Sequence, residues 1–185
     1  FSYGLGDAGT GLAASQLGFY LFVFFTAIAR LDPIVAGSLL MIIKVWDGVN
    51  DPAIGWASDR TRSRWGPRLP WMLFAALPLG ISLSAMWVVP DVGETSKIIY
   101  YALMSILLMT SYTAVNLPYA ALSTEITSSI KTRTRLNAAR FTGSILASLS
   151  GLILAWILTQ EGEAGYKLMG QITGFLVTFA TLMCC

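Results

Sequence analysis

The chain has 185 residues, of which 55% are hydrophobic and only 12% are charged, and its mean hydropathy is +0.66. A typical soluble domain has about 25% charged residues, so this chain lacks roughly half the ionic surface that a water-soluble protein needs. The formal net charge of +2, the lack of histidine and the two cysteines exclude a strongly basic nucleic-acid binder, a zinc module and a disulfide-built module. The composition therefore predicts a protein of the lipid bilayer.

Long segments without charge recur along the whole chain. Five stretches of 18 residues or more contain no Asp, Glu, Lys or Arg, namely 8–29, 69–90, 98–124, 141–160 and 168–185. Each is long enough to cross about 30 Å of hydrocarbon as an α-helix. The segment 36–57 is apolar except for four polar residues, and it must cross as well so that its neighbours alternate sides. We therefore predict an all-α bundle of six transmembrane helices at about 8–29, 36–57, 69–90, 98–120, 138–160 and 167–185.

Positive charges concentrate in two of the five connectors. The connectors after the second and fourth spans contain Arg60, Arg62, Arg64 and Arg68, and Lys131, Arg133 and Arg135, respectively. The other three contain one basic residue each. Short loops rich in Lys and Arg stay on the cytoplasmic side, so we predict that both basic connectors and the N-terminus are cytoplasmic and that the protein lies in the cell (inner) membrane. This topology signal is preferred over recognition of nucleic acid or anionic lipid.

The second span carries the most informative side chains. On a helix, Lys44, Asp47 and Asp51 fall within about a 60° sector, with Asn50 beside them. Ionisable residues inside a membrane usually lie on ion or substrate pathways, and a merely structural Lys-Asp ion pair is the alternative. The two carboxylates lie one turn apart and repel each other, and a proton or a small cation such as Na⁺ or Li⁺ would relieve this repulsion. We therefore predict a carrier coupled to Na⁺, Li⁺ or H⁺, without a cofactor.

These residues lie within longer motifs. The string Lys44-Val45-Trp46-Asp47-Gly48-Val49-Asn50-Asp51-Pro52 is followed by Gly55-Trp56-Ala57-Ser58-Asp59-Arg60-Thr61-Arg62-Ser63-Arg64-Trp65-Gly66. The opening Ser2-Tyr3-Gly4-Leu5-Gly6-Asp7 and the stretch Ser111-Tyr112-Thr113-Ala114-Val115-Asn116-Leu117-Pro118-Tyr119 belong to the same pattern. Together these motifs resemble the glycoside-pentoside-hexuronide:cation symporters (melibiose permease-like), a branch of the major facilitator superfamily.

The resemblance implies a secondary active transporter that couples a cation to a sugar or glycoside by alternating access. It implies that the cation ligands are Asp47, Asn50, Asp51 and Thr113. It also implies that a cytoplasmic motif helping to close the inward gate contains Asp59, Arg60, Arg62 and Arg64. Such carriers have twelve helices, so this chain is expected to be the N-terminal half. The expected partners are the bilayer, a small-molecule substrate and a C-terminal six-helix half outside this chain.

The substrate residues match this family less well. In the melibiose permease the positions aligned with Gly11 and Asn116 are acidic and the one aligned with Ala120 is tryptophan, whereas Arg140 is shared. A galactoside is therefore less expected than another glycoside, a sugar acid or another solute. The candidate substrate-binding residues are Asn116, Arg140, Tyr20 and Tyr119. Aromatic packing and snorkelling of the arginine are the structural alternatives.

Other functional classes fit less well. Gly4-Leu5-Gly6-Asp7 spells the GxGD string of intramembrane aspartyl proteases, but the sequence lacks the Tyr-Asp pair that those enzymes also contain. We therefore expect no enzymatic activity. The alternatives to a sugar symporter are a major facilitator carrier of a non-sugar solute, such as a lysolipid or a sugar acid, and a non-transporting membrane receptor.

Overall fold

A computed structural model describes residues 2–64, 66, 68–126 and 130–184, and the side chains of residues 2–6, 122–126, 130 and 133 lie outside that description. The described chain forms six α-helices: α1 (Ser2–Val23), α2 (Pro33–Arg60), α3 (Leu69–Met86), α4 (Glu94–Ile126), α5 (Ile130–Leu158) and α6 (Glu163–Met183). A π-helical turn, η1 (Phe24–Ile28), continues α1, and a 3-10 turn, η2 (Thr159–Glu161), precedes α6. The predicted all-α bundle of six helices is confirmed.

Five of the described helices are long and apolar enough to cross a membrane, over Asp7–Ile28, Pro33–Arg60, Leu69–Met86, Glu94–Ala121 and Thr134–Glu161. The remaining helix, α6, has 21 residues, but Lys167, Gln171 and its threonines lower its apolarity. The sixth span therefore stays a prediction. From Phe141 onward the exposed side chains of α5 are mostly large and apolar, as expected of a helix that faces lipid.

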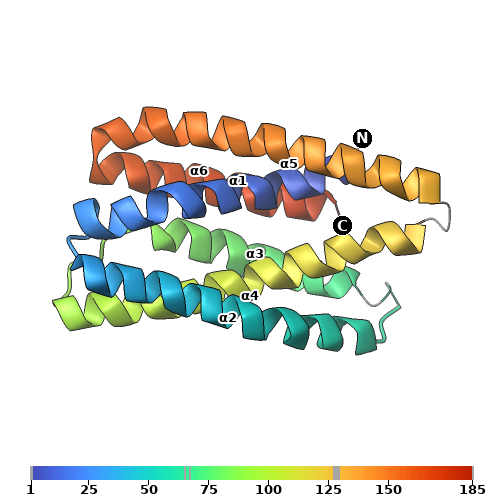
Figure 1. Cartoon of the computed structure of the whole chain (residues 1–185), viewed down its shortest axis with the longest axis horizontal. Coiled ribbons are helices and arrows are strands. Elements are labelled where there is room, and N and C mark those ends of the chain that lie inside the picture. The colour runs from blue at the N-terminus through green and yellow to red at the C-terminus, as the bar shows by residue number, and fades with distance from the viewer. Residues whose placement is uncertain (1, 65, 67, 127–129, 185) are drawn as a thin grey trace.

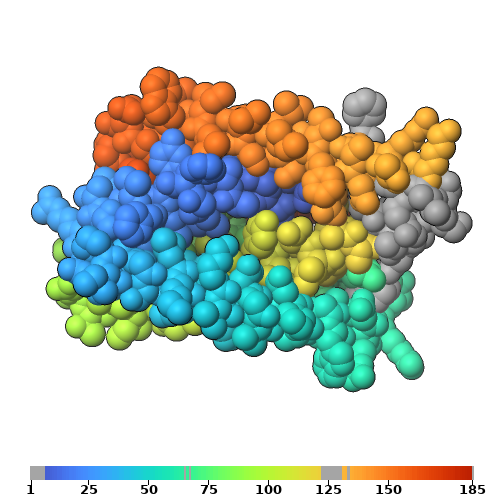
Figure 2. All heavy atoms as spheres, in the orientation of Figure 1, coloured from blue at the N-terminus to red at the C-terminus, as the bar shows by residue number. Residues whose placement is uncertain are grey.

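The helices run alternately in opposite directions (Figure 1). α1 packs along α5 and α6, α3 packs between α4 and α6, and α2 packs mainly against α4. Contact between α1 and α2 and between α4 and α5 is slight. The surface is accordingly hollowed between α1 and α2, with α4 beside the hollow (Figure 2). Polar residues of α2 and α4 lie beside this hollow.

Local sequence signals set the start of α2. Asp32 is its N-cap, because its carboxylate accepts a 2.8 Å hydrogen bond from the backbone N–H of Ile34. Pro33 occupies the first turn, where a missing N–H costs nothing. The helix therefore begins at the edge of the apolar segment and carries Asp47 and Asp51 into its second half.

Buried aromatic rings close the end of the bundle away from the N-terminus. The Phe24 ring centroid lies 5.3 Å from those of Trp87 and Tyr166 and 6.1 Å from that of Tyr101. Because these four residues come from η1, the end of α3, α4 and α6, the cluster ties four segments together at this end. The bundle that contains the hollow beside α4 is therefore held together at this end by the packing of aromatic rings.

Several helix boundaries differ from the predicted spans. α3 ends at Met86, before the predicted limit at 90, and α5 begins at Ile130 rather than near 138. Lys131 and Arg135 thus lie in the first turns of α5, not in a connector, and the side chain of Arg133 is outside the description. Lys and Arg are good helix formers, so α5 begins before its apolar segment, where these residues precede it.

Candidate functional site

Side-chain hydrogen bonds join α2 to α4 along one part of their interface. The bonds run from Trp46 Nε1 to the Thr110 hydroxyl (3.0 Å), from Asn50 Nδ2 to the Met109 carbonyl (3.4 Å) and from the Thr113 hydroxyl to Asp51 Oδ1 (2.9 Å). Asn50 and Thr113 are buried, and Asp51 is half-buried. Three of the four predicted cation ligands therefore lie at one seam between two helices.

The fourth predicted ligand, Asp47, lies one helical turn before Asp51 and is half-buried. It lines a cavity of about 350 Å³ between α1, α2 and α4. Lys44 and Tyr112 line the same cavity, and most of the remaining lining is aliphatic. Asp47 is repelled electrostatically by Asp51 and attracted by Lys44. When all three side chains are ionised, Lys44 and the two aspartates leave one net negative charge beside the cavity.

The chemistry of this group suits a hard cation. Thr113 donates its hydrogen to Asp51, so its oxygen keeps lone pairs that a cation can use. Asn50 uses its amide nitrogen in the bond to Met109, which leaves the amide oxygen as a candidate ligand. Among the residues that the structure describes, His, Cys, Asp and Glu form no group of three or more that could hold a metal ion. The candidate ligand set is therefore a mixture of carboxylate, amide and hydroxyl oxygens, as hard cations prefer.

A second polar cluster joins α1, α4 and α5. Arg140 Nε lies 3.1 Å from Asp7 Oδ2, and the two side chains are only 14% and 9% exposed. Asp7 Oδ1 also accepts a 3.1 Å hydrogen bond from the Thr10 hydroxyl. The Arg140 guanidinium carbon lies 5.9 Å from the centroid of the Tyr119 ring. This cluster contains two of the predicted substrate residues, Arg140 and Tyr119, together with a carboxylate that sequence reasoning missed.

The signal that points to Asp7 is its rarity. It is the single acidic residue in the first 31 residues of the chain. Arg140 borders the uncharged stretch of the fifth predicted span in the same way. An acid and a base that each enter an apolar segment alone are candidates for a pair, because burying one without the other is costly.

Tyr112 lies near both polar clusters. Its hydroxyl interacts electrostatically with Asp47 and Asp51 and also with Asp7 and Arg140. On α4, residues 112, 116 and 119 follow i, i+4 and i+7 spacing and so share one face. A polar stripe on α4 therefore runs from the cavity to the Asp7–Arg140 pair.

The remaining two predicted substrate residues are placed differently. Asn116 is half-buried and lies between Tyr112 and Tyr119 on the α4 stripe. Tyr20 packs against the apolar core and lies 13 residues after Asp7, about 20 Å farther along α1. The structure thus brings Asn116, Arg140 and Tyr119 to one region and places Tyr20 away from it.

The predicted gating segment lies at the end of α2 and just beyond it. Arg68 Nη2 is 3.2 Å from Asp59 Oδ1, and the Asp59 side chain is 64% exposed. The guanidinium of Arg60 stacks 4.1 Å above the Trp56 ring centroid. Arg62 and Arg64 are exposed. The Arg68 side chain is only 16% exposed, but Asp59 is open to water, and screening by water weakens a partly exposed ion pair.

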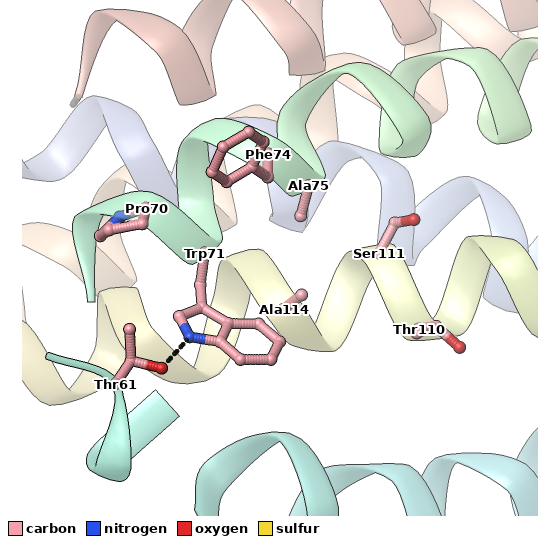
Figure 3. Close-up of a pocket in the computed structure, with 8 residues that line it drawn as sticks. All are labelled: Thr61, Pro70, Trp71, Phe74, Ala75, Thr110, Ser111 and Ala114. Carbon is pink, nitrogen blue, oxygen red and sulfur yellow. Dashed lines mark hydrogen bonds between the residues drawn. The ribbon is translucent and has the colours of Figure 1, made fainter. Parts of the chain in front are cut away.

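A second cavity, of about 440 Å³, lies between the end of α2, α3 and α4 (Figure 3). Trp71 donates a 2.9 Å hydrogen bond from Nε1 to the Thr61 hydroxyl across its rim. The lining residues are Thr61, Pro70, Trp71, Phe74, Ala75, Thr110, Ser111 and Ala114. None of them is charged, so the cavity beside Asp47 is the stronger candidate for a coupled transport site.

Residues 2–185 match the model of the family described as MFS/sugar transport protein. The chain belongs to this family. The predicted membership among major facilitator symporters is confirmed, and with its membrane-length helices the chain is an integral, multi-pass membrane protein.

Individual relatives are symporters. The chain is 45% identical over 167 residues to an uncharacterized symporter of Synechocystis sp. (87% of this chain, 30% of the relative). It is 38% identical over 169 residues to a putative glycoside/cation symporter, YagG, of Escherichia coli (89% and 37%). It is 31% identical over 150 residues to the sodium-dependent lysophosphatidylcholine symporter 1-A of Danio rerio (80% and 28%). The chain spans about a third of the length of these relatives.

Proposed function

We propose that this chain is the N-terminal six-helix half of a symporter that couples a cation to a sugar or glycoside. The observation that carries the proposal is the Thr113–Asp51 hydrogen bond between α4 and α2, beside the cavity that Asp47 lines. The printed names of two relatives, a putative glycoside/cation symporter and a sodium-dependent symporter, support cation coupling. The protein lies in the cell (inner) membrane. The end of the bundle with the two basic segments faces the cytoplasm.

The coupling mechanism follows from charge. A cation held by Asp47, Asn50, Asp51 and Thr113 neutralises the repulsion between the two carboxylates and draws α2 and α4 together. The stripe on α4 that carries Asn116 then presents its polar groups to the substrate. The occupied carrier rocks to open inward while Arg60, Arg62, Arg64 and Asp59 exchange their contacts at the cytoplasmic gate. Na⁺, Li⁺ and H⁺ all suit the oxygen ligands.

Uptake into membrane vesicles tests the cation site. Full-length protein is assayed with a panel of labelled sugars in an inward gradient of each cation in turn. We expect Asp47→Asn and Asp51→Asn to abolish coupled uptake, because each removes a negative charge from the ligand set. Asp91→Asn, an equal change at an exposed position after α3, is the matched control and should transport normally. Wild-type uptake and cation binding in both site variants would disprove the assignment.

Equilibrium coupling gives a second test. If the cation organises the substrate site, then saturating cation must tighten sugar binding by the same factor by which sugar tightens cation binding. Isothermal titration of the purified protein measures both factors. Unequal factors at equilibrium would rule out this scheme even where uptake depends on the cation.

A lysolipid carrier is the second candidate. The aliphatic side chains that line most of the cavity beside Asp47 suit an acyl chain, and one relative is named as a lysophosphatidylcholine symporter. The same vesicles are therefore assayed with labelled lysophosphatidylcholine. Cation-dependent uptake of the lysolipid, with no uptake of any sugar, would replace the sugar proposal. Binding without uptake of either would indicate a receptor.

A further inference from the structure

We propose that the cavity of about 440 Å³ between the end of α2, α3 and α4 binds an anionic phospholipid of the bilayer. The cavity takes one acyl chain, and arginines of the segment at its rim hold the phosphate. This lipid site goes beyond the proposed transport function, because it involves neither the transported solute nor the coupled cation.

The lining of the cavity suits an acyl chain better than a polar solute. Thr61 and Thr110 each donate their hydroxyl hydrogen to the backbone carbonyl four residues earlier, and each accepts a hydrogen bond from a tryptophan indole. The lining side chains without a polar atom are Pro70, Phe74, Ala75 and Ala114. The volume lies within the range of about 300–1,000 Å³ that is typical of ligand pockets. The cavity therefore offers an occupant mainly apolar surface.

Part of this lining lies on the outer side of α3. Phe74 is 80% exposed, and Leu77 and Ile81, at i+3 and i+7 from it, are exposed on the same face. These side chains are large and apolar, as expected where a membrane helix contacts lipid tails. At Phe74 the cavity is therefore accessible to an acyl chain from the bilayer.

The cavity lies on the other side of α4 from the cavity that Asp47 lines. Ser111 and Ala114 of α4 line the present cavity. Each comes two positions after a residue, Met109 or Tyr112, that lines the other cavity. Two positions correspond to about 200° around a helix, so the two sets of side chains point in nearly opposite directions. An occupant of the present cavity is therefore separate from a solute beside Asp47.

Arginines follow the rim of the cavity. Thr61, which accepts the hydrogen bond from Trp71 at this rim (Figure 3), is followed by Arg62 and Arg64, and both arginines are exposed. Asp59 is the single acidic residue between positions 59 and 68, and it pairs with Arg68. Arginine binds phosphate through charge-assisted hydrogen bonds, and basic residues at a membrane surface attract anionic lipids. Recognition of a lipid phosphate adds to the part that these arginines play in topology.

Trp56 and Arg60 place the rim at the level of the lipid headgroups. The Arg60 guanidinium lies 4.1 Å above the Trp56 ring centroid, and both side chains are exposed. Exposed tryptophans of membrane helices are enriched at the interface between hydrocarbon and water. Thr61 follows Arg60 directly and lines the cavity. The arginines and the cavity therefore lie at the depths of the phosphate and the acyl chain of one lipid.

Two lipids with the same acyl chains test the inference. Full-length protein is stripped of lipid in detergent and titrated with dioleoyl phosphatidylglycerol, which is anionic, or with dioleoyl phosphatidylcholine, which is neutral overall. Native mass spectrometry measures the affinity for each lipid. Glycerol phosphate, the anionic headgroup without acyl chains, is the soluble probe. The variants are Arg62→Gln/Arg64→Gln and the matched control Lys131→Gln/Arg135→Gln, which removes the same charge from two exposed positions at the start of α5.

We expect wild type to bind phosphatidylglycerol at least about fivefold more tightly than phosphatidylcholine, the effect of one basic residue near an anionic lipid. Arg62→Gln/Arg64→Gln should lose most of this preference, and the control should keep it. Glycerol phosphate should not bind, because it has no chain for the cavity. Equal affinity for the two lipids, an equal loss in both double variants, or tight binding of glycerol phosphate would overturn the inference.

Photolabelling locates the acyl chain independently of affinity. Phosphatidylglycerol with a diazirine at the end of one chain is activated by light in the wild-type protein. Peptides covering residues 70–75 and 110–114 should carry most of the label. Label mainly on other helices, or a dimer of the protein that binds no lipid and so assigns the cavity to a second copy, would overturn the inference. None of these measurements depends on transport, so their failure leaves the symporter proposal intact.

Discussion

Thr113 on α4 donates a 2.9 Å hydrogen bond to Oδ1 of Asp51 on α2, although the two residues are 62 positions apart in the chain. α2 makes most of its helix contacts with α4. A cation that binds both residues would therefore act directly on the interface that holds α2 in the bundle. Binding and helix movement are linked through one pair of side chains.

The Thr113 hydroxyl should be required for cation binding. Thr113→Val keeps the shape of the side chain but removes the oxygen, whereas Thr113→Ser keeps the oxygen. We expect the valine variant to bind the cation about tenfold or more weakly, since bonds to charged groups contribute about 1.5–3 kcal/mol. The serine variant should stay within about threefold of wild type. Cation titration of tryptophan fluorescence measures both, and equal affinities in the two variants would contradict this role.

Lys44 should weaken cation binding at Asp47. Its ammonium group attracts Asp47 electrostatically and lines the same cavity, so it competes with a bound cation. We expect Lys44→Met to raise cation affinity about three- to tenfold, an effect that added salt reduces. Lys167→Met, at an exposed position near the start of α6, is the matched control and should have wild-type affinity. A weaker affinity in Lys44→Met would mean that Lys44 orients the carboxylate instead.

The polar residues of α2 could be predicted from the sequence because one helix determines their relative positions. Asp47, Asn50 and Asp51 share a face through helical periodicity alone, with no knowledge of the neighbouring helices. The Asp7–Arg140 pair depends instead on the register of α1 against α5, two segments separated by most of the chain. That register is set by close packing, as at Gly11 against Ser144. A single sequence carries no direct record of such an approach.

The predicted spans do not give the helix ends, for a related reason. Hydropathy locates the part of a helix inside the hydrocarbon, but hydrogen bonding and propensity decide where the helix stops. Lys131 and Arg135 extend α5 beyond its apolar part, whereas α3 ends at Met86 although apolar residues follow. Apolar content and helix length are thus separate properties of a membrane segment.

The Trp71–Thr61 hydrogen bond should fasten the segment that follows α2 to α3. Trp71→Phe removes the donor and Thr61→Val removes the acceptor of this 2.9 Å bond. We expect a double-mutant cycle of thermal unfolding to give a coupling of about 0.5–1.5 kcal/mol. Hydrogen exchange of peptides covering residues 57–64 should become faster in either variant. Trp156→Phe, at a side chain 64% exposed on α5, is the control, and equal exchange in all variants would exclude the fastening role.

The contact between α3 and α6 should tolerate no added methyl group at Gly174. A Cβ atom there would collide with the Ser84 hydroxyl and would lie 2.6 Å from the Gly80 carbonyl oxygen, which cannot move without its helix. Small residues allow membrane helices to approach closely, and their loss separates the backbones. We expect Gly174→Ala to destabilise the protein by about 1–3 kcal/mol, seen as a lower Tm in detergent.

Gly37→Ala on α2 is the control, because no atom lies within 4 Å of its added Cβ. The control should unfold at or slightly above the wild-type Tm, since alanine favours a helix more than glycine does. A Gly174→Ala protein as stable as the Gly37→Ala protein would show that α3 and α6 do not pack this closely.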